Sequence, residues 1–169
     1  MRKKTSKNQP SRMLIIAIFA VVLIALVPII THLMRPNFDV EWLPTTGTQI
    51  LTNAEMDAIL NDDRRDVGVF VYIGMAGCPA CVQFEPTLHT TLAEHGLGLR
   101  HFQIEDARAE NEEVAGEILA TISRRARRTW EGGVPVIKLF VGGEIVDYLV
   151  GIQSQADITR FFERHGGLE

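Results

Sequence analysis

The feature that most constrains this chain is a pair of cysteines, Cys78 and Cys81, separated by two residues. Residues 67–73 before the pair are β-branched and aromatic, which predicts a buried strand, and residues 79–95 after it predict a helix. A Cys-x-x-Cys motif in this setting is typical of thiols that cycle between dithiol and disulfide. Cys78 would lie at the helix N-terminus, where free amide groups and the helix dipole stabilise a thiolate.

Three other interpretations of the cysteines are inert buried thiols, half of a zinc site, and a static disulfide. The sequence holds 2 cysteines and no second Cys-x-x-Cys or His-x-x-His, so tetrahedral zinc would lack ligands within one chain. A bridge across two residues closes too short a loop to stabilise a fold much. The redox interpretation is therefore favoured.

Charge divides the 169-residue chain into two parts. All 21 acidic residues lie from Asp39 onward, so that part is acidic, which argues against nucleic acid as a partner. The first twelve residues are instead strongly basic, with Arg2, Lys3, Lys4, Lys7 and Arg12.

Residues 13–34 contain no Asp, Glu, Lys or Arg and predict a transmembrane helix. A helix of this length reaches about 33 Å, enough for a hydrocarbon core of about 30 Å. Because basic residues precede the span, we expect a cytoplasmic N-terminus and a domain outside the cytoplasm. The alternative is a cleaved signal peptide with an unusually long apolar region.

The predicted organisation has four parts. Residues 1–12 are a cytoplasmic basic tail, 13–34 the transmembrane helix, 35–48 a linker, and 49–169 a folded domain. Trp42 in the linker is expected either at the membrane interface or packed on the domain.

The domain is expected to be an α/β mixed sheet flanked by helices. Besides the strand and helix around the cysteines, hydrophobic spacing and turn residues predict strands at 48–51, 99–104, 136–141 and 145–150. Capping patterns begin helices after Thr52 and Ser154, and a further helix is expected over residues 112–128.

Several motifs spread along residues 49–166 resemble the thioredoxin-fold family. They are the sequence Cys78-Pro79-Ala80-Cys81, the helix proline Pro86, Gly133-Val134-Pro135 before a strand, and the terminal hairpin with Gly151 beyond it. The resemblance implies a thioredoxin-like mixed sheet preceded by one transmembrane helix. It also implies that Pro135 follows a cis bond and packs against the cysteines.

The residues of the motif suggest a division of roles. Cys78 would be the nucleophile and Cys81 the resolving cysteine, so the redox-active disulfide between them would need no other cofactor. Substrate contacts are expected from Pro79 and Ala80 beside the thiols and from the Val134 backbone next to Pro135, where an extended substrate would pair. Trp130 would either flank this groove or pack in the core.

Within the family, Tyr72-Ile73-Gly74 leading into Gly77-Cys78-Pro79 looks most like the bacteriocin-accessory group, which are tethered proteins that assist disulfide formation in exported peptides. This resemblance implies a membrane-anchored thiol–disulfide oxidoreductase acting on exported polypeptides, with a possible redox partner in the membrane. The alternatives are an extracytoplasmic reductase, as in cytochrome c maturation, and a non-catalytic adaptor with a fixed bridge.

Other features leave the direction of electron flow open. Tyr72 stands where thioredoxins have an acidic residue, Gly77 replaces a tryptophan, and the central pair is Pro-Ala. His101 is either a structural strand residue or a proton relay. The basic cluster at residues 124–128 either complements a helix C-terminus or binds an anionic lipid or acidic partner.

Overall fold

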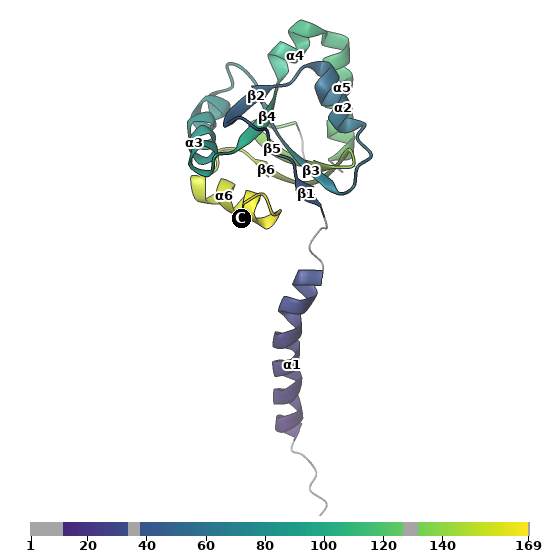
Figure 1. The fold of residues 1–169 in the computed structure, drawn as a ribbon, viewed down its shortest axis with the longest axis vertical. Helices are drawn as coiled ribbons and strands as arrows, with labels where there is room; N and C mark the ends of the chain where they lie inside the picture. The colour runs from purple at the N-terminus through teal and green to yellow at the C-terminus, as the bar shows by residue number, and fades with distance from the viewer. Residues whose placement is uncertain (1–11, 34–37, 127–131, 169) are drawn as a thin grey trace, which may run out of the picture. The chain divides into compact units, whose positions relative to one another are not determined.

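The computed structural model describes residues 12–33, 38–126 and 132–168. The chain separates into two units, residues 1–36 and 37–169, and each is considered by itself. Figure 1 shows the helix of the first unit and the mixed sheet of the second.

The first unit contains α1, Arg12–Leu33, a helix of 22 residues where the sequence predicts one. Its described side chains, at residues 16–22 and 24–27, are exposed. Among the residues that the structure describes, no helix combines the length and the apolar character needed to cross a membrane. The membrane span over residues 13–34 therefore stays a prediction.

The second unit is built on one sheet, confirming the predicted mixed α/β arrangement. In its described part the order is β2-β4-β3-β5-β6, with β1 beside β3. The first four strands pair in parallel and the last two are antiparallel to their neighbours. The strands are β1 Asp39–Val40, β2 Gly47–Ile50, β3 Val67–Gly74, β4 Gly98–Gln103, β5 Val136–Val141 and β6 Glu144–Val150.

Helices cover both faces of this sheet (Figure 1). One core cluster joins α2, α4 and α5 to one face, and another joins α3 and α6 to the opposite face. The helices are α2 Asn53–Leu60, α3 Pro79–His95, α4 Ile104–Glu110, α5 Glu112–Arg125 and α6 Gln155–Arg164.

Strand β3 lies at the centre of the sheet, and its alternating side chains divide between the two core clusters. Val71 and Ile73 pack toward α2 and α5, whereas Phe70 and Tyr72 pack toward α3 and α6. These side chains are at most 1% exposed, so both faces are buried, as the β-branched and aromatic run predicts. The strand therefore fixes the position of the loop that leads to Cys78.

The folded unit begins earlier than the predicted boundary at residue 49. Within the segment predicted as a linker, β1 pairs in parallel with β3 through Asp39 and Val40. Trp42 stacks on Phe70 at 5.2 Å between ring centroids and meets Phe162 edge-on at 5.1 Å. Residues 38–42 alternate apolar and polar side chains, a strand signal that the linker prediction did not use, and Phe38, Val40 and Trp42 pack on the same core cluster.

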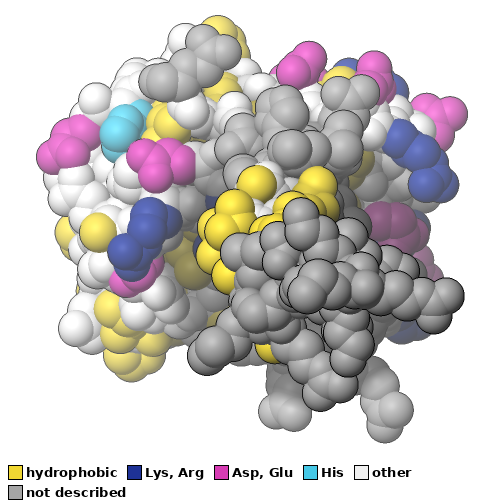
Figure 2. Space-filling view, turned by 90° about the horizontal axis from the view of Figure 1, so that it is seen from below, with side chains coloured by type: hydrophobic (Ala, Val, Ile, Leu, Met, Phe, Trp, Pro, Cys, Tyr) yellow, Lys and Arg dark blue, Asp and Glu magenta, His cyan; other side chains and the backbone are white. Residues whose placement is uncertain are grey.

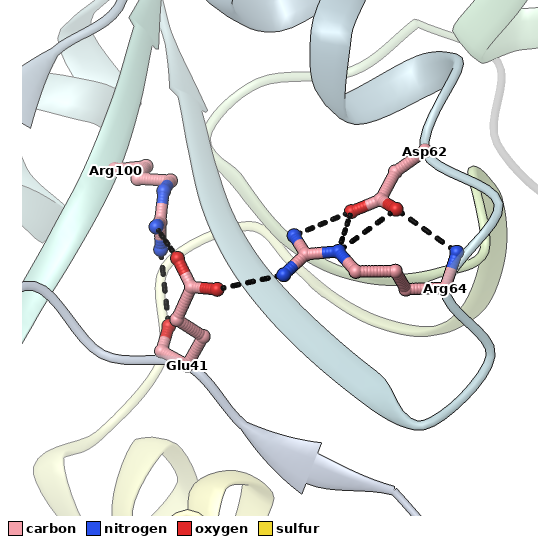
Figure 3. A network of polar contacts seen from close by, with 4 residues as sticks. All are labelled: Glu41, Asp62, Arg64 and Arg100. Carbon is pink, nitrogen blue, oxygen red and sulfur yellow. Dashed lines mark hydrogen bonds and ion pairs between the residues drawn. The ribbon is translucent and has the colours of Figure 1, made fainter.

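Polar contacts reinforce the attachment of this segment (Figure 3). Arg100 on β4 donates to the Glu41 backbone carbonyl at 3.0 Å and also pairs with its carboxylate. Arg64 reaches Glu41 at 3.5 Å and Asp62 at 2.7 Å. The hydrogen bonds from Arg64 lower the pKa of Asp62. Since exposed ion pairs contribute little to stability, Trp42 packing is the stronger attachment.

Helix α4 has no counterpart in the sequence prediction. The structure ends β4 at Gln103 and begins α4 directly at Ile104, a residue predicted to close the strand. Gln103 makes no side-chain capping bond, so the usual helix-start signal is missing. Helix α5 ends at Arg125, and the remainder of the basic cluster, at residues 127–128, lies outside the described residues.

Acidic and basic side chains are interspersed on the face of the molecule seen in Figure 2. The described part of this face therefore shows no single acidic patch, although the sequence carries more acidic than basic residues. This mixture is typical of a solvated protein surface.

Candidate active site

The two cysteines meet at the start of α3. Cys78 is the N-cap residue, and its Sγ accepts a hydrogen bond from the Cys81 backbone amide at 3.2 Å. Pro79 occupies the first turn, where its fixed φ suits a helix and its missing amide leaves no donor unsatisfied. The sequence therefore folds so that the sulfur of Cys78 accepts a hydrogen bond from one of the free amide groups at the start of the helix.

Cys81 lies one turn further on and is 1% exposed. Burial, followed by its contact with Cys78, raises the pKa of the Cys81 thiol to about 11. Both cysteines are unbridged in this structure, which is the dithiol form of the pair. The arrangement can therefore support attack by one sulfur and later displacement by the other.

Cys78 is less exposed than its expected role as an open nucleophile suggests. Its exposed fraction is 7%, against 1% for Cys81. The reason is the neighbouring segment before β5, where the Val134 carbonyl accepts a hydrogen bond from the Cys78 thiol at 3.7 Å. The predicted order of exposure is kept, but the difference between the two thiols is small.

The approach of Val134 to Cys78 follows from the topology of the sheet. Strand β5 runs antiparallel to β3 with Ile73 opposite Val136, so the start of β5 meets the end of β3. The Val134–Pro135 bond is cis, as the family resemblance implies. Pro135 is buried and Val134 is half-buried, which leaves the latter partly accessible beside the thiol.

The remaining predicted contact residues lie in different settings. Pro79 is exposed and Ala80 is half-buried, both within the first turn of α3. The structure thus brings together Cys78, Cys81 and Val134 with their immediate neighbours. Trp130 lies outside the described residues.

The loop before Cys78 is held by the unpredicted helix α4. Glu105, in its first turn, accepts a hydrogen bond from the Ala76 backbone amide at 2.7 Å. Gly77 follows with φ of +72°, a left-handed conformation that suits glycine and turns the chain into the cap. A carboxylate from α4 therefore positions the segment that presents the nucleophile.

Two polar residues behind the cysteines were not among the predicted site residues. Tyr72 on β3 donates a hydrogen bond from its hydroxyl to the Glu85 carboxylate on α3 at 3.1 Å. The partners are 13 positions apart and on different elements, so no local pattern signals the pair. The one signal in the sequence was the identity of residue 72, because a tyrosine stands where thioredoxins have an acidic residue.

His101 on β4 contacts the ring of Tyr72. Their rings are 4.5 Å apart between centroids, and the pKa of His101 is lowered, mainly by burial. Its Nε2 has no hydrogen-bond partner among the described residues. The neutral imidazole is therefore the favoured form near neutral pH.

Comparisons with known proteins find structural similarity. No family model and no curated protein matches the chain. Among solved structures, a thioredoxin of Malassezia sympodialis matches at 16% identity and a TM-score of 0.48, covering 74% of this chain and 96% of that one. A mutant thioredoxin of Halobacterium salinarum matches at 21% identity and a TM-score of 0.45, covering 72% of this chain and 93% of that one.

Proposed function

We propose that the domain is a thiol–disulfide oxidoreductase that acts through Cys78 and Cys81. The observation that carries the proposal is the capping geometry, in which the Cys81 amide donates to the Cys78 sulfur at 3.2 Å one turn before a more deeply buried second thiol. The first sulfur lies at the start of the helix, and burial keeps the second thiol protonated until it is needed.

The proposed reaction has two exchange steps. The Cys78 thiolate attacks a substrate disulfide, forms a mixed disulfide and releases one substrate thiolate. The Cys81 thiolate then attacks the Cys78 sulfur, which releases the second substrate thiolate and closes the Cys78–Cys81 disulfide. Oxidation of a substrate dithiol is the same sequence in reverse, so the geometry serves either direction.

The proposed substrate is an exported polypeptide that carries thiols or disulfides. An extended strand of it would pair with the Val134 backbone, beside Pro79 and Ala80. We place the domain outside the cytoplasm, tethered by residues 13–34, because that stretch lacks charged residues and basic residues precede it. An oxidising compartment also permits the disulfides that such a protein would handle.

The direct test is to trap the mixed disulfide. In a Cys81→Ala variant the resolving thiol is missing, so Cys78 should stay linked to its client and the adduct should be recoverable on a non-reducing gel. Cys78→Ala is the matched control and should trap nothing, because Cys81 is buried and keeps its proton.

Two outcomes would contradict this assignment. Trapping by Cys78→Ala alone would reverse the roles of the two thiols. If neither variant forms an adduct with a client or a small disulfide, the pair is a fixed feature of a non-catalytic adaptor. The shielding of Cys78, which is 7% exposed, is the observation that keeps this second candidate in view.

A further inference from the structure

The loop of residues 75–77 presents Cys78 and lies largely at the surface. Ala76 and Gly77 are exposed, whereas Met75 packs against the core cluster that joins α2 and α5 to the sheet. Gly77 has a φ of +72°, and a Cβ built on it would meet no atom within 4 Å. Glycine in an exposed loop has many accessible backbone conformations. The position of the Cys78 sulfur therefore depends on what holds this loop.

A side chain from outside the loop holds it at its middle. The Glu105 carboxylate, in the first turn of α4, accepts a hydrogen bond from the Ala76 backbone amide at 2.7 Å. Within the loop, the Met75 carbonyl accepts a hydrogen bond from the Cys78 amide at 3.3 Å. The bond to Glu105 is the shorter of the two, and hydrogen bonds to a charged group are also the stronger kind.

The pairing of β3 with β4 brings Glu105 to the loop. Gly74, the last residue of β3, lies opposite Gln103, the last residue of β4. Ala76 follows Gly74 by two residues, and Glu105 follows Gln103 by two residues, so both leave the same edge of the sheet side by side. The contact depends on α4 beginning directly after β4, because an intervening turn would carry Glu105 away from the loop.

Helix α4 is itself fixed by the first residue of α2. The side chain of Asn53, which is 3% exposed, donates to the Ala107 carbonyl at 2.8 Å, and its backbone amide donates to the Glu110 carboxylate at 2.9 Å. A buried amide side chain that bonds to another element fixes how the two elements lie together. Hydrogen bonds therefore run in series from Asn53 through α4 and Glu105 to the loop before Cys78.

We propose that Glu105 is a positioning residue for the attack by Cys78. Through the Ala76 amide it holds the loop in the conformation that aims the Cys78 sulfur at a disulfide, and Asn53 acts through α4 to keep Glu105 in place. This inference rests on the proposed function and names the groups outside the cysteine motif on which its first exchange step depends. The attacking sulfur must approach in line with the bond that breaks, so a small displacement of the loop slows the reaction.

The chemical step remains thiol–disulfide exchange. The Cys78 thiolate forms a bond to one sulfur of the disulfide, the S–S bond breaks, and the other sulfur leaves as a thiolate with the bonding electron pair. Glu105 gains or loses no proton or electron in this step. Because its effect is on geometry, its removal should slow the attack by a similar factor at every pH.

The test measures the attack by Cys78 alone. The reduced full chain, in detergent solution and carrying Cys81→Ala, has Cys78 as its single thiol. It is mixed with dithiodipyridine, an uncharged disulfide that releases one coloured thione for each attack. Glu105→Ala removes the acceptor for the Ala76 amide, and Glu105→Gln retains a carbonyl acceptor without the charge. Asp106→Ala is the matched control, because it removes an exposed carboxylate from the same helical turn.

Glu105→Ala should slow the release of thione by about tenfold, by a similar factor at every pH tested. Glu105→Gln and Asp106→Ala should keep the rate of the chain that carries Cys81→Ala alone. Rescue by glutamine would show that the hydrogen bond, rather than the negative charge, positions the loop.

The role of Asn53 is tested by combining variants. Asn53→Ala removes the bond to the Ala107 carbonyl and should also slow the attack. Combined with Glu105→Ala it should give no further slowing, because two groups that act in series are not additive. Effects that multiply in the combined variant would show that Asn53 acts by another route and would overturn the series.

An unchanged or faster attack in Glu105→Ala would overturn the positioning role. Equal slowing in Glu105→Ala and Glu105→Gln, or slowing confined to part of the pH range, would assign the effect to charge and overturn it as well. Urea unfolding checks that each variant is folded, and if Glu105→Ala fails this check, the comparison of Asn53→Ala with Asp106→Ala decides. If Cys78 does not react in the chain that carries Cys81→Ala alone, the proposed function itself fails, so the two failures are distinguishable.

Discussion

At the scale of single residues, Cys78 and Cys81 differ in burial and hydrogen bonding because they lie three residues apart at the start of the same helix. Cys78 caps α3 and accepts an amide hydrogen bond, whereas Cys81 lies within the first turn of the helix and is shielded from solvent. The sequence spacing predicts this division, because one helical turn separates an end from an interior. It does not predict the carbonyl of Val134 at 3.7 Å from Cys78, which depends on the pairing of β3 with β5.

The ionisation of Cys81 follows from its burial. With its pKa raised to about 11, the native thiol keeps its proton at pH values where the unfolded thiol, with a pKa of about 8.5, loses it. The unfolded state binds fewer protons in this window, so the stability of the reduced domain should fall as the pH rises from about 9 to about 11. Thiolate absorbance of a Cys78→Ser variant should show the ionisation midpoint, and a midpoint below that of a free cysteine would contradict the account.

At the scale of elements, the site depends on a helix that the sequence pattern did not reveal. Strand β3 and helix α3 were predictable because each has a strong local signal, namely an apolar run and a Cys-Pro cap. Helix α4 follows β4 without a turn or a capping side chain, and tertiary contacts hold it: Ile104 and Ala107 pack in the core, and Asn53 donates hydrogen bonds to this helix. Its Glu105 then holds the loop before the cysteines.

Removal of that contact should loosen the loop. Glu105→Ala deletes the acceptor for the Ala76 amide and should lower the free energy of unfolding by about 1 kcal/mol. Glu105→Gln retains a carbonyl acceptor and should recover most of the loss. Urea unfolding of the two variants provides the measurement, and equal stability of the alanine and glutamine forms would show that the hydrogen bond does not stabilise the loop.

At the scale of the whole molecule, the sequence predicts an apolar N-terminal segment followed by an α/β domain, but the predicted start of the domain, residue 49, lies after its observed start at Asn37. Residues 38–42 alternate apolar and polar side chains, which is a strand signal, but their place in the domain depends on Trp42 meeting Phe70 and Phe162, which are distant in sequence. The Tyr72–Glu85 pair was missed for the same reason, since its contact exists only after β3 and α3 pack. Local patterns predict elements, and tertiary contacts decide which side chains meet.

The proposed topology makes a prediction for intact cells. Basic residues before the apolar segment favour a cytoplasmic N-terminus, so Cys78 should lie outside. A membrane-impermeant thiol reagent, applied after reduction, should modify Cys78 without cell lysis. Labelling that requires lysis would place the domain on the cytoplasmic side and exclude exported polypeptides as its substrates.

The central claim is that Cys78 and Cys81 form a reversible redox couple, and a titration of the protein in glutathione and dithiothreitol buffers tests it most directly. The fraction of disulfide should follow a two-electron equilibrium with a midpoint between about −270 and −120 mV, the range spanned by thiol–disulfide oxidoreductases. The midpoint would also indicate whether reduction or oxidation is the favoured direction. A pair that remains fully reduced or fully oxidised across all buffers would contradict the account.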